Sequence, residues 1–422
     1  MVFATAKSLT EKILLLRRHS DLSSQDVGPA LEYIDNYWPK LTRYLPKDDD
    51  SLVGLPNPYL VPSFEKGHEF DFNELYYWDS YFMVQGMLDK KHQKLVVGVL
   101  EDLLFMLDRF KIIPNASRTY LMGRSQPPFL TSFILDVYKT YGLDKKWLAS
   151  AMEKAEGEYN RVWMGTSKPN ARQVHRGLSR YYDVNYLNDL AEAESGWDMT
   201  TRFGHKCLNY LPVDLNALLY KYEVDLAYAA TELGKEQDAK KWKKAANSRK
   251  QTMDALMWSE LKGQYYDYNF AREQRGSINS LAAYYTMWAG MADERQAKKL
   301  VSSLRKFENQ GGLATTDSAL VGQLIPGSLP AQWAYPNGWA PLHFIVVKGL
   351  QRYGYHEDAR RIAIKWLKTN LDWYNNHGVF LEKYNVVQPG KPPAKGLYPS
   401  QTGFGWTNAV FTRFCQEFIK ED

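Results

Sequence analysis

Two short strings in this chain carry carboxyl groups in settings that suit acid–base chemistry. The first is Glu194-Ser-Gly-Trp-Asp198, in which Gly196 permits a tight turn and Trp197 would set an apolar ring beside the Asp198 carboxyl. Burial against an indole disfavours the charged form and raises the pKa of a carboxyl group, as a general acid near neutral pH requires. The alternative interpretation is an N-capping Asp beside a core Trp.

The second string is Glu382-Lys-Tyr384, which follows the apolar stretch Gly378-Val-Phe-Leu. A Glu on such an apolar and aromatic stretch could act as a carboxylate base. With Lys383 as its neighbour, it could instead belong to a surface ion pair. Taken alone, this string favours the surface ion pair.

A third carboxyl group, Asp79, lies in the string Tyr76-Tyr-Trp-Asp-Ser-Tyr-Phe82. An Asp among five aromatic residues needs a polar partner, and sugar hydroxyls would serve, with Trp78 or Tyr77 stacking on the apolar face of the ring. Alternatively, Asp79 caps the following helix.

Three further segments combine planar polar groups, aromatic rings and small residues. Residues 115–128 carry the amides and guanidiniums of Asn115, Arg124 and Gln126 just before a double proline that forbids helix there. Such planar groups match vicinal hydroxyls. Residues 332–341 include Trp333, and residues 403–408 include Trp406 between small residues that let backbone and rings approach a ligand closely.

The elements that must position these residues are predicted to be helices. Apolar residues recur at three- and four-residue steps in residues 92–110, 212–233, 278–291 and 341–353. A weak repeat joins them: an apolar helix ends near a glycine, and a charged amphipathic helix follows. The glycines are Gly86, Gly142, Gly234, Gly290 and Gly354.

Helical hairpins repeated in this way predict a closed double ring of helices, with an open α-solenoid as the alternative. Long polar and aromatic loops, residues 54–75, 163–202, 311–337 and 382–405, lie between the hairpins and hold or flank the candidate residues. We therefore expect one domain over residues 1–422, with residues 1–55 as an N-terminal helical extension and the loops forming a site over one end.

Composition narrows the function classes. The chain has 422 residues, 45% of them hydrophobic, with 13 Trp and 29 Tyr. The net charge of +5 comes from scattered Lys and Arg and does not indicate a nucleic-acid partner. No run of about 18 apolar residues predicts a membrane span. Cys207 and Cys415 lack metal-type or redox spacing, so two free core thiols are expected rather than a disulfide. The apolar run near residue 15 is too short for a secretory signal. These features predict a cytoplasmic protein.

With these motifs in order, the sequence resembles the trehalases of glycoside hydrolase family 37, whose clan includes family 63. The resemblance runs from about residue 60 to about residue 420 and also includes Pro212-Val-Asp-Leu-Asn216. It implies an all-α (α/α)6 barrel, an anomer-inverting mechanism with Asp198 as acid and Glu382 as base, and no metal or organic cofactor. The candidate sugar-binding residues are Phe72, Tyr77, Trp78, Asp79, Asn115, Arg124, Gln126, Gly196, Trp333, Gln401 and Trp406.

Departures from the family pattern fall on residues expected to hold the leaving-group sugar. Asp71 stands where an Arg is expected, Leu397 replaces an acidic residue, and Ala334 replaces an Asp. A second family Arg, upstream of the acid, has no counterpart. We therefore expect weaker binding of trehalose unless another cation takes over; the candidates are Arg118, Arg176 and Lys66.

Three functions remain open from the sequence. The first is an α,α-trehalase that yields two glucose molecules. The second is the same chemistry on another small α-glucoside or α-mannoside, such as glucosylglycerate or mannosylglycerate. The third is an inactive carbohydrate-binding protein. The expected partner is a small sugar, without nucleic acid or membrane, and a monomer is favoured.

Overall fold

Helices dominate the computed structural model, which describes residues 22–64, 72–318, 331–394, 396 and 400–420. Strands in these ranges are two or three residues long and form sheets of two or three strands. None of the helices in these ranges is long and apolar enough to cross a membrane. Cys207 and Cys415 are buried free thiols, as predicted.

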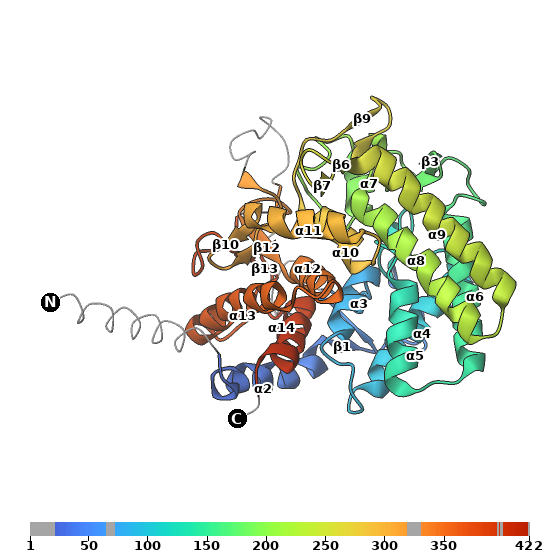
Figure 1. Ribbon diagram of the computed structural model, residues 1–422. Coiled ribbons are helices and arrows are strands. Elements are labelled where there is room, and N and C mark those ends of the chain that lie inside the picture. Colours follow the sequence, from blue (N-terminus) through green and yellow to red (C-terminus); the bar gives the residue numbers. More distant parts are fainter. Residues whose placement is uncertain (1–21, 65–71, 319–330, 395, 397–399, 421–422) are drawn as a thin grey trace.

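Twelve of the described helices form two concentric layers (Figure 1). The inner helices are α3 (Tyr77–Val84), α5 (Leu130–Tyr141), α8 (Val213–Glu232), α10 (Tyr285–Trp288, preceded by the 3-10 turn Leu281–Tyr284), α12 (Ala340–Arg352) and α14 (Gly405–Phe418). The outer helices are α4 (Gln93–Phe110), α6 (Lys145–Glu158), α9 (Glu236–Met257), α11 (Glu294–Ser303), α13 (His356–His377) and α2 (Ser24–Leu41). Five of the inner helices are each followed along the chain by an outer helix, and α2 packs as the outer helix beside α14.

The inner helices close into a ring. α5 packs against α8, α8 against α10, α10 against α12, α12 against α14, and α14 against α3. Tyr81 on α3 completes the circle by meeting Phe133 on α5, with ring centroids 6.3 Å apart. The predicted (α/α)6 barrel is therefore confirmed, and the open solenoid is wrong.

Burial explains the division into layers. All eight residues of α3 are buried, whereas α9 buries one stripe whose residues recur at three- and four-residue steps, from Ala239 and Trp242 to Met257. A helix that is apolar on every side belongs between other elements, and a helix with one apolar stripe belongs on the outside. The inner and outer roles thus follow from the sequence pattern.

The glycines at the hairpin turns serve two purposes. Gly142, the cap of α5, has a φ of 62°, the left-handed conformation that lets the chain leave a helix abruptly. Gly86 differs, because a Cβ there would lie 2.6 Å from the backbone of Ala409 on α14. Its missing side chain allows the end of α3 to approach α14 closely, where the ring closes.

The outer helix of the sixth pair comes from the N-terminal part of the chain. α2 packs against α13 and α14, and Figure 1 shows it, in blue, beside the red α14. The expected extension over residues 1–55 thus contains a barrel helix at Ser24–Leu41, followed by a short strand and loops. Residues 1–21 lie outside the described residues.

The long loops gather at one end of the barrel. Each inner helix from α5 onward follows the outer helix of the preceding pair, so the inner helices run in one direction and the segments that lead into them meet. Tyr77 N–H donates to the Asn115 carbonyl at 3.3 Å, and Trp333 N–H donates to the Met199 carbonyl at 2.9 Å. These bonds link loops that are far apart in the sequence, around the site described next.

Candidate active site

A cavity of about 260 Å³ opens among the loops at the N-terminal ends of the inner helices. Its described lining is Pro62, Phe72, Tyr76, Trp78, Asp79, Asn115, Leu121, Arg124, Gln126, Ala193, Gly196, Asp198, Trp333, Glu382, Phe404 and Trp406. Eleven of the thirteen candidate residues named from the sequence belong to this set, including both proposed catalytic carboxyls. The fold therefore brings together residues from six separate segments.

The other two candidates, Tyr77 and Gln401, lie behind this lining. The Tyr77 hydroxyl donates to Glu158 Oε2 at 3.2 Å and accepts from Leu130 N–H at 3.1 Å, so its ring points into the barrel wall. Successive helical residues point about 100° apart, which is why Trp78 faces the cavity and Tyr77 does not. Gln401 is buried, and its carbonyl accepts from the Glu382 N–H at 3.0 Å.

Sequence reasoning missed five lining residues. Tyr76 lies three residues before Asp79, so helical spacing could have placed both on one face. Phe404 belongs to a segment singled out for its aromatic and small residues, but was not selected. Pro62, Leu121 and Ala193 are ordinary apolar residues with no signal in their local sequence.

Asp198 is held by its backbone at the cavity wall. Gly196, with a φ of 72°, makes the turn, and a Cβ there would lie 2.5 Å from the Trp78 ring. The Gln332 amide donates to the Asp198 carbonyl at 2.5 Å. Burial, together with the smaller effect of the negative charge of Glu382, raises the pKa of Asp198 to about 7. Its carboxyl group is thus suited to hold a proton near neutral pH.

Trp197 supports this wall from behind and is not part of the described lining. Its ring stacks on Trp333 with centroids 5.7 Å apart, and the Arg202 guanidinium lies 4.4 Å from its centroid. The sequence predicts this indole beside the acid, and the described contacts of its ring include those with Trp333 and Arg202.

Glu382 lies in a buried ion pair. Lys383 Nζ approaches Glu382 Oε2 to 2.6 Å, with the two side chains 0% and 1% exposed. The surface ion pair considered from the sequence is therefore wrong. The pairing of β13 (Lys383–Asn385) with β12 (Asn337–Trp339) buries this string, and the Lys383 ammonium lies 5.0 Å from the Trp339 ring centroid. A carboxyl group in the cavity with an ammonium partner is the kind of group that could act as a base.

Asp79 adds a third carboxyl group to the cavity. Burial is the largest cause that raises its pKa, to about 8, and the negative charges of Asp198 and Glu382 act in the same direction. Gln126 accepts from Trp78 N–H at 2.9 Å, and its side chain also bonds to Asp79. Asp79 is therefore suited to remain protonated at neutral pH and to donate a hydrogen bond.

The remaining polar groups hold the loop that precedes α5. The Asn115 amide donates to the Ser125 carbonyl at 3.1 Å, and Arg124 Nη1 donates to Asp183 Oδ2 at 3.2 Å. Arg124 Nε is buried and has no partner among the described protein atoms. A ligand hydroxyl in the cavity could satisfy this donor.

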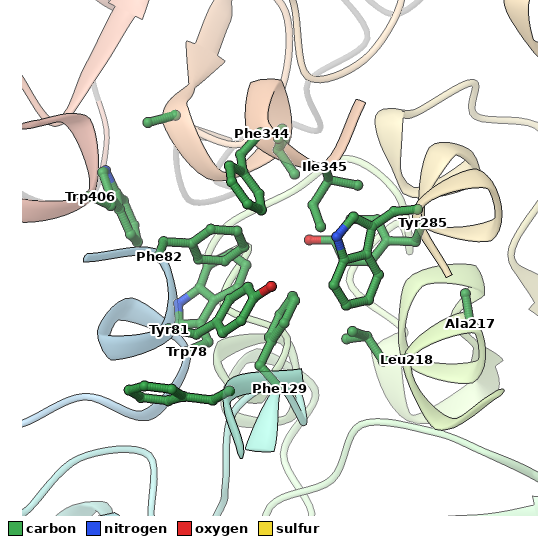
Figure 2. Packing of buried hydrophobic residues seen from close by; sticks show 14 of the residues in the cluster. Trp78, Tyr81, Phe82, Phe129, Ala217, Leu218, Tyr285, Phe344, Ile345 and Trp406 are labelled. Atoms are coloured by element: carbon green, nitrogen blue, oxygen red, sulfur yellow. The ribbon is translucent and has the colours of Figure 1, made fainter. Parts of the chain in front are cut away.

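Indole rings form the apolar part of the wall. Trp333 stacks on Trp339 with centroids 3.7 Å apart and planes 3° apart. Trp78 meets Trp406 edge to face at 5.8 Å, and Figure 2 shows these two rings beside Phe82, where the wall joins the barrel core. Flat apolar faces next to carboxyls and amides suit a sugar, which has both C–H faces and hydroxyl edges.

The structure describes only some of the residues considered for binding the leaving-group sugar. Ala334 is buried, whereas Asp71, Leu397 and Lys66 lie outside the described residues. Arg118 is held by Glu74 at 2.9 Å and by Ser51 at 2.8 Å, and it does not line the cavity. Arg176 is exposed at the turn between two short strands, β3 (Gln173–His175) and β4 (Leu178–Ser179).

An (α/α)6 barrel whose loop end holds three carboxyls and several indoles has the architecture of the helical-barrel glycoside hydrolases. The Trehalase family model matches residues 10–189 and 183–418, and the chain belongs to this family. It is 33% identical to the cytosolic neutral trehalase of Kluyveromyces lactis, over 86% of this chain and 56% of that protein. It is 34% identical to the periplasmic trehalase of Xanthomonas axonopodis pv. citri, over 93% of this chain and 73% of that one. The chain thus spans little more than half the length of the first of these relatives.

Solved structures agree on the fold. The neutral trehalase from Saccharomyces cerevisiae superposes with a TM-score of 0.74 at 30% identity, covering 85% of this chain and 73% of that one. A family 63 mannosylglycerate hydrolase from Thermus thermophilus superposes with a TM-score of 0.66 at 15% identity, covering 91% and 99%. At that identity the second likeness concerns the barrel alone.

Proposed function

We propose that this chain hydrolyses α,α-trehalose to two glucose molecules with inversion, using Asp198 as general acid and Glu382 as general base. The observation that carries the proposal is the contrast between these two carboxyls in one cavity. Burial raises the pKa of Asp198 to about 7, while Glu382 has the buried Lys383 ammonium at 2.6 Å. Paired carboxyls in contrasting environments are typical of an acid and a base. Membership of the trehalase family supports the choice of substrate.

In the proposed mechanism Asp198 gives its proton to the oxygen between the two sugars as that bond breaks. Glu382 takes a proton from a water molecule, which attacks the anomeric carbon from the opposite face. Inverting enzymes separate their carboxyls by about 6.5–9.5 Å to leave room for this water. One β-glucose, from the attacked carbon, and one α-glucose leave the site.

The other cavity residues would bind and orient the sugar. The indoles of Trp78, Trp333 and Trp406 offer apolar faces, and Arg124 offers its unsatisfied Nε. The inner helices direct their N-terminal ends, the positive ends of their dipoles, toward this site.

The test is proton NMR of the first turnover products, before mutarotation mixes the anomers. Inversion predicts that the glucose carrying the attacked carbon appears as its β anomer. If only α anomer appears, retention has occurred, and Glu382 is not the water-activating base. A panel of α-linked disaccharides, glucosylglycerate and mannosylglycerate, scored by released glucose or mannose, tests the substrate. Sugar binding without turnover of any panel member would instead indicate the inactive binding protein.

We also propose that the chain acts in the cytoplasm as a single catalytic domain and a monomer. The two buried free thiols, Cys207 and Cys415, and the similarity to cytosolic neutral trehalases support the compartment. Periplasmic trehalases are comparably similar, so cell fractionation is the appropriate test. Light scattering on the purified protein measures the oligomeric state.

A further inference from the structure

Glu194 is a fully buried carboxylate that accepts four hydrogen bonds, although it does not line the cavity. Its side chain is 0% exposed. The backbone N–H groups of Ser125 and Tyr182 donate to its two oxygens, each at 2.7 Å. Arg172 approaches both oxygens through Nη2 and Nε, the latter at 3.1 Å. Nearly every lone pair of this carboxylate is thus used.

The donors come from segments that carry cavity residues. Ser125 lies between Arg124 and Gln126, both of which line the cavity. Tyr182 precedes Asp183, which accepts from Arg124 Nη1. Glu194 itself ends helix α7 (Asn188–Glu194), four residues before the acid. One carboxylate therefore joins the sugar-binding loop, the segment that orients Arg124, and the segment that carries Asp198.

We propose that Glu194 and Arg172 are positioning residues, which fix the geometry of Arg124 and Gln126 relative to Asp198. This inference rests on the proposed function. The backbone at Ser125, Tyr182 and Asp198 is irregular, so no helix ladder sets the relative positions of these residues. A bidentate Arg–carboxylate pair is directional as well as strong. Displacing a reacting group by about 1 Å can cost roughly 100-fold in rate, so such a clamp matters to catalysis.

A second buried pair of the same chemistry separates positioning from stability. Glu223 on α8 and Arg249 on α9 lie 2.8 Å apart with side chains 1% and 3% exposed. Arg249 also donates to the Tyr159 hydroxyl, the Asn216 side chain, the Gly177 carbonyl and the Met164 sulfur, and none of these residues belongs to the described lining of the cavity. This pair links helices of the barrel wall and provides a matched control for the cost of removing a buried ion pair.

The experiment compares two double variants of the full chain. The 172/194 variant carries Arg172→Met and Glu194→Met, and the 223/249 variant carries Arg249→Met and Glu223→Met. Removing both partners avoids leaving a buried charge unpaired. We measure the melting temperature, kcat and KM for trehalose, and glucose binding through the fluorescence of the cavity tryptophans. The 172/194 variant should melt at the lower temperature, because the buried N–H groups of Ser125 and Tyr182 lose their acceptor, so activities are compared per folded molecule. The 172/194 variant should lose at least about tenfold in kcat/KM, with both kcat and KM affected.

The 223/249 variant should keep the wild-type kcat/KM per folded molecule. If the two variants lose activity equally, or if neither does, the clamp is only structural and the proposal is overturned. Should the 172/194 variant fail to fold, Glu194→Gln replaces it. This amide can still accept from Ser125 but presents donors to Tyr182 or Arg172. A wild-type kcat/KM and glucose affinity in that variant would overturn the proposal.

Glucose binding separates this inference from the proposed function. A wild-type chain that binds glucose without cleaving trehalose would contradict the proposed hydrolysis. The positioning role would then still predict a glucose affinity weaker by about tenfold in the 172/194 variant, equivalent to the loss of one charge-assisted hydrogen bond. An unchanged glucose affinity would overturn the positioning role in either case.

Discussion

Replacing Asp198 with Asn should abolish hydrolysis and yet make the folded protein more stable above neutral pH. The wild-type carboxyl has its pKa raised from 3.8 to about 7, chiefly by burial. The folded state therefore holds this proton more tightly than the unfolded state does. Stability is lost as pH rises from the unfolded value through the folded value, and the loss is complete above about pH 7. Asn has the shape of the protonated carboxyl but does not ionise, so the stability of the variant does not fall for this reason as pH rises.

The magnitude follows from the shift in pKa. Each pH unit between 3.8 and about 7 removes roughly 1.4 kcal/mol from the wild type relative to Asp198→Asn. From pH 5 to pH 8 the advantage of the variant should grow by roughly 2–3 kcal/mol. An entropy of unfolding of about 2.1 cal/mol/K per residue gives roughly 0.9 kcal/mol/K for this chain. The difference in melting temperature should thus grow by roughly 3 °C.

The assay is thermal unfolding of both proteins, followed by circular dichroism at pH 5 and pH 8. Asp372→Asn, at an exposed position on α13, serves as the control for the chemical change alone. A difference between Asp198→Asn and the wild type that stays constant with pH would refute the argument that burial holds this proton. A variant less stable than the wild type at pH 8 would do the same.

Three further outcomes are expected. Asp198→Ala and Glu382→Ala should each lower kcat by at least about 100-fold. The wild-type pH–rate profile should be bell-shaped, with its alkaline limb near pH 7 as Asp198 loses its proton. A profile that stays flat to pH 9 would exclude Asp198 as the acid. Gly196→Ala should destabilise the fold by about 2–4 kcal/mol and reduce activity, because its φ is 72° and a Cβ would lie 2.5 Å from Trp78. Chemical denaturation measures the loss of stability. A denaturation midpoint equal to that of the wild type would contradict the close approach of Gly196 to Trp78. Arg118→Ala should leave the KM for trehalose unchanged, since its guanidinium is engaged outside the cavity lining; a raised KM would mean that this cation reaches the leaving-group sugar after all.

Much of the fold was predictable because its signals are local. Three- and four-residue spacing of apolar side chains predicts a helix and its buried face, and a glycine such as Gly142 marks where the helix ends. The order of the carboxyl strings also pointed to their shared chemistry. These patterns depend on residues a few positions apart, so a single sequence contains them.

Tertiary structure decided which side chains share the cavity and in what environment. The string around Glu382 is compatible with a surface ion pair, and only the pairing of β12 with β13 buries it beside Lys383. Tyr77 and Trp78 are adjacent aromatic residues, but the rotation of α3 within the ring sends one to Glu158 and the other to the cavity. Glu194 could not be identified as the partner of Ser125, because 69 residues separate them. The burial and the hydrogen-bond partners of these side chains depend on segments that meet only when the ring closes. The sequence alone therefore determined the helices and the candidate chemistry. It did not determine the geometry of the site.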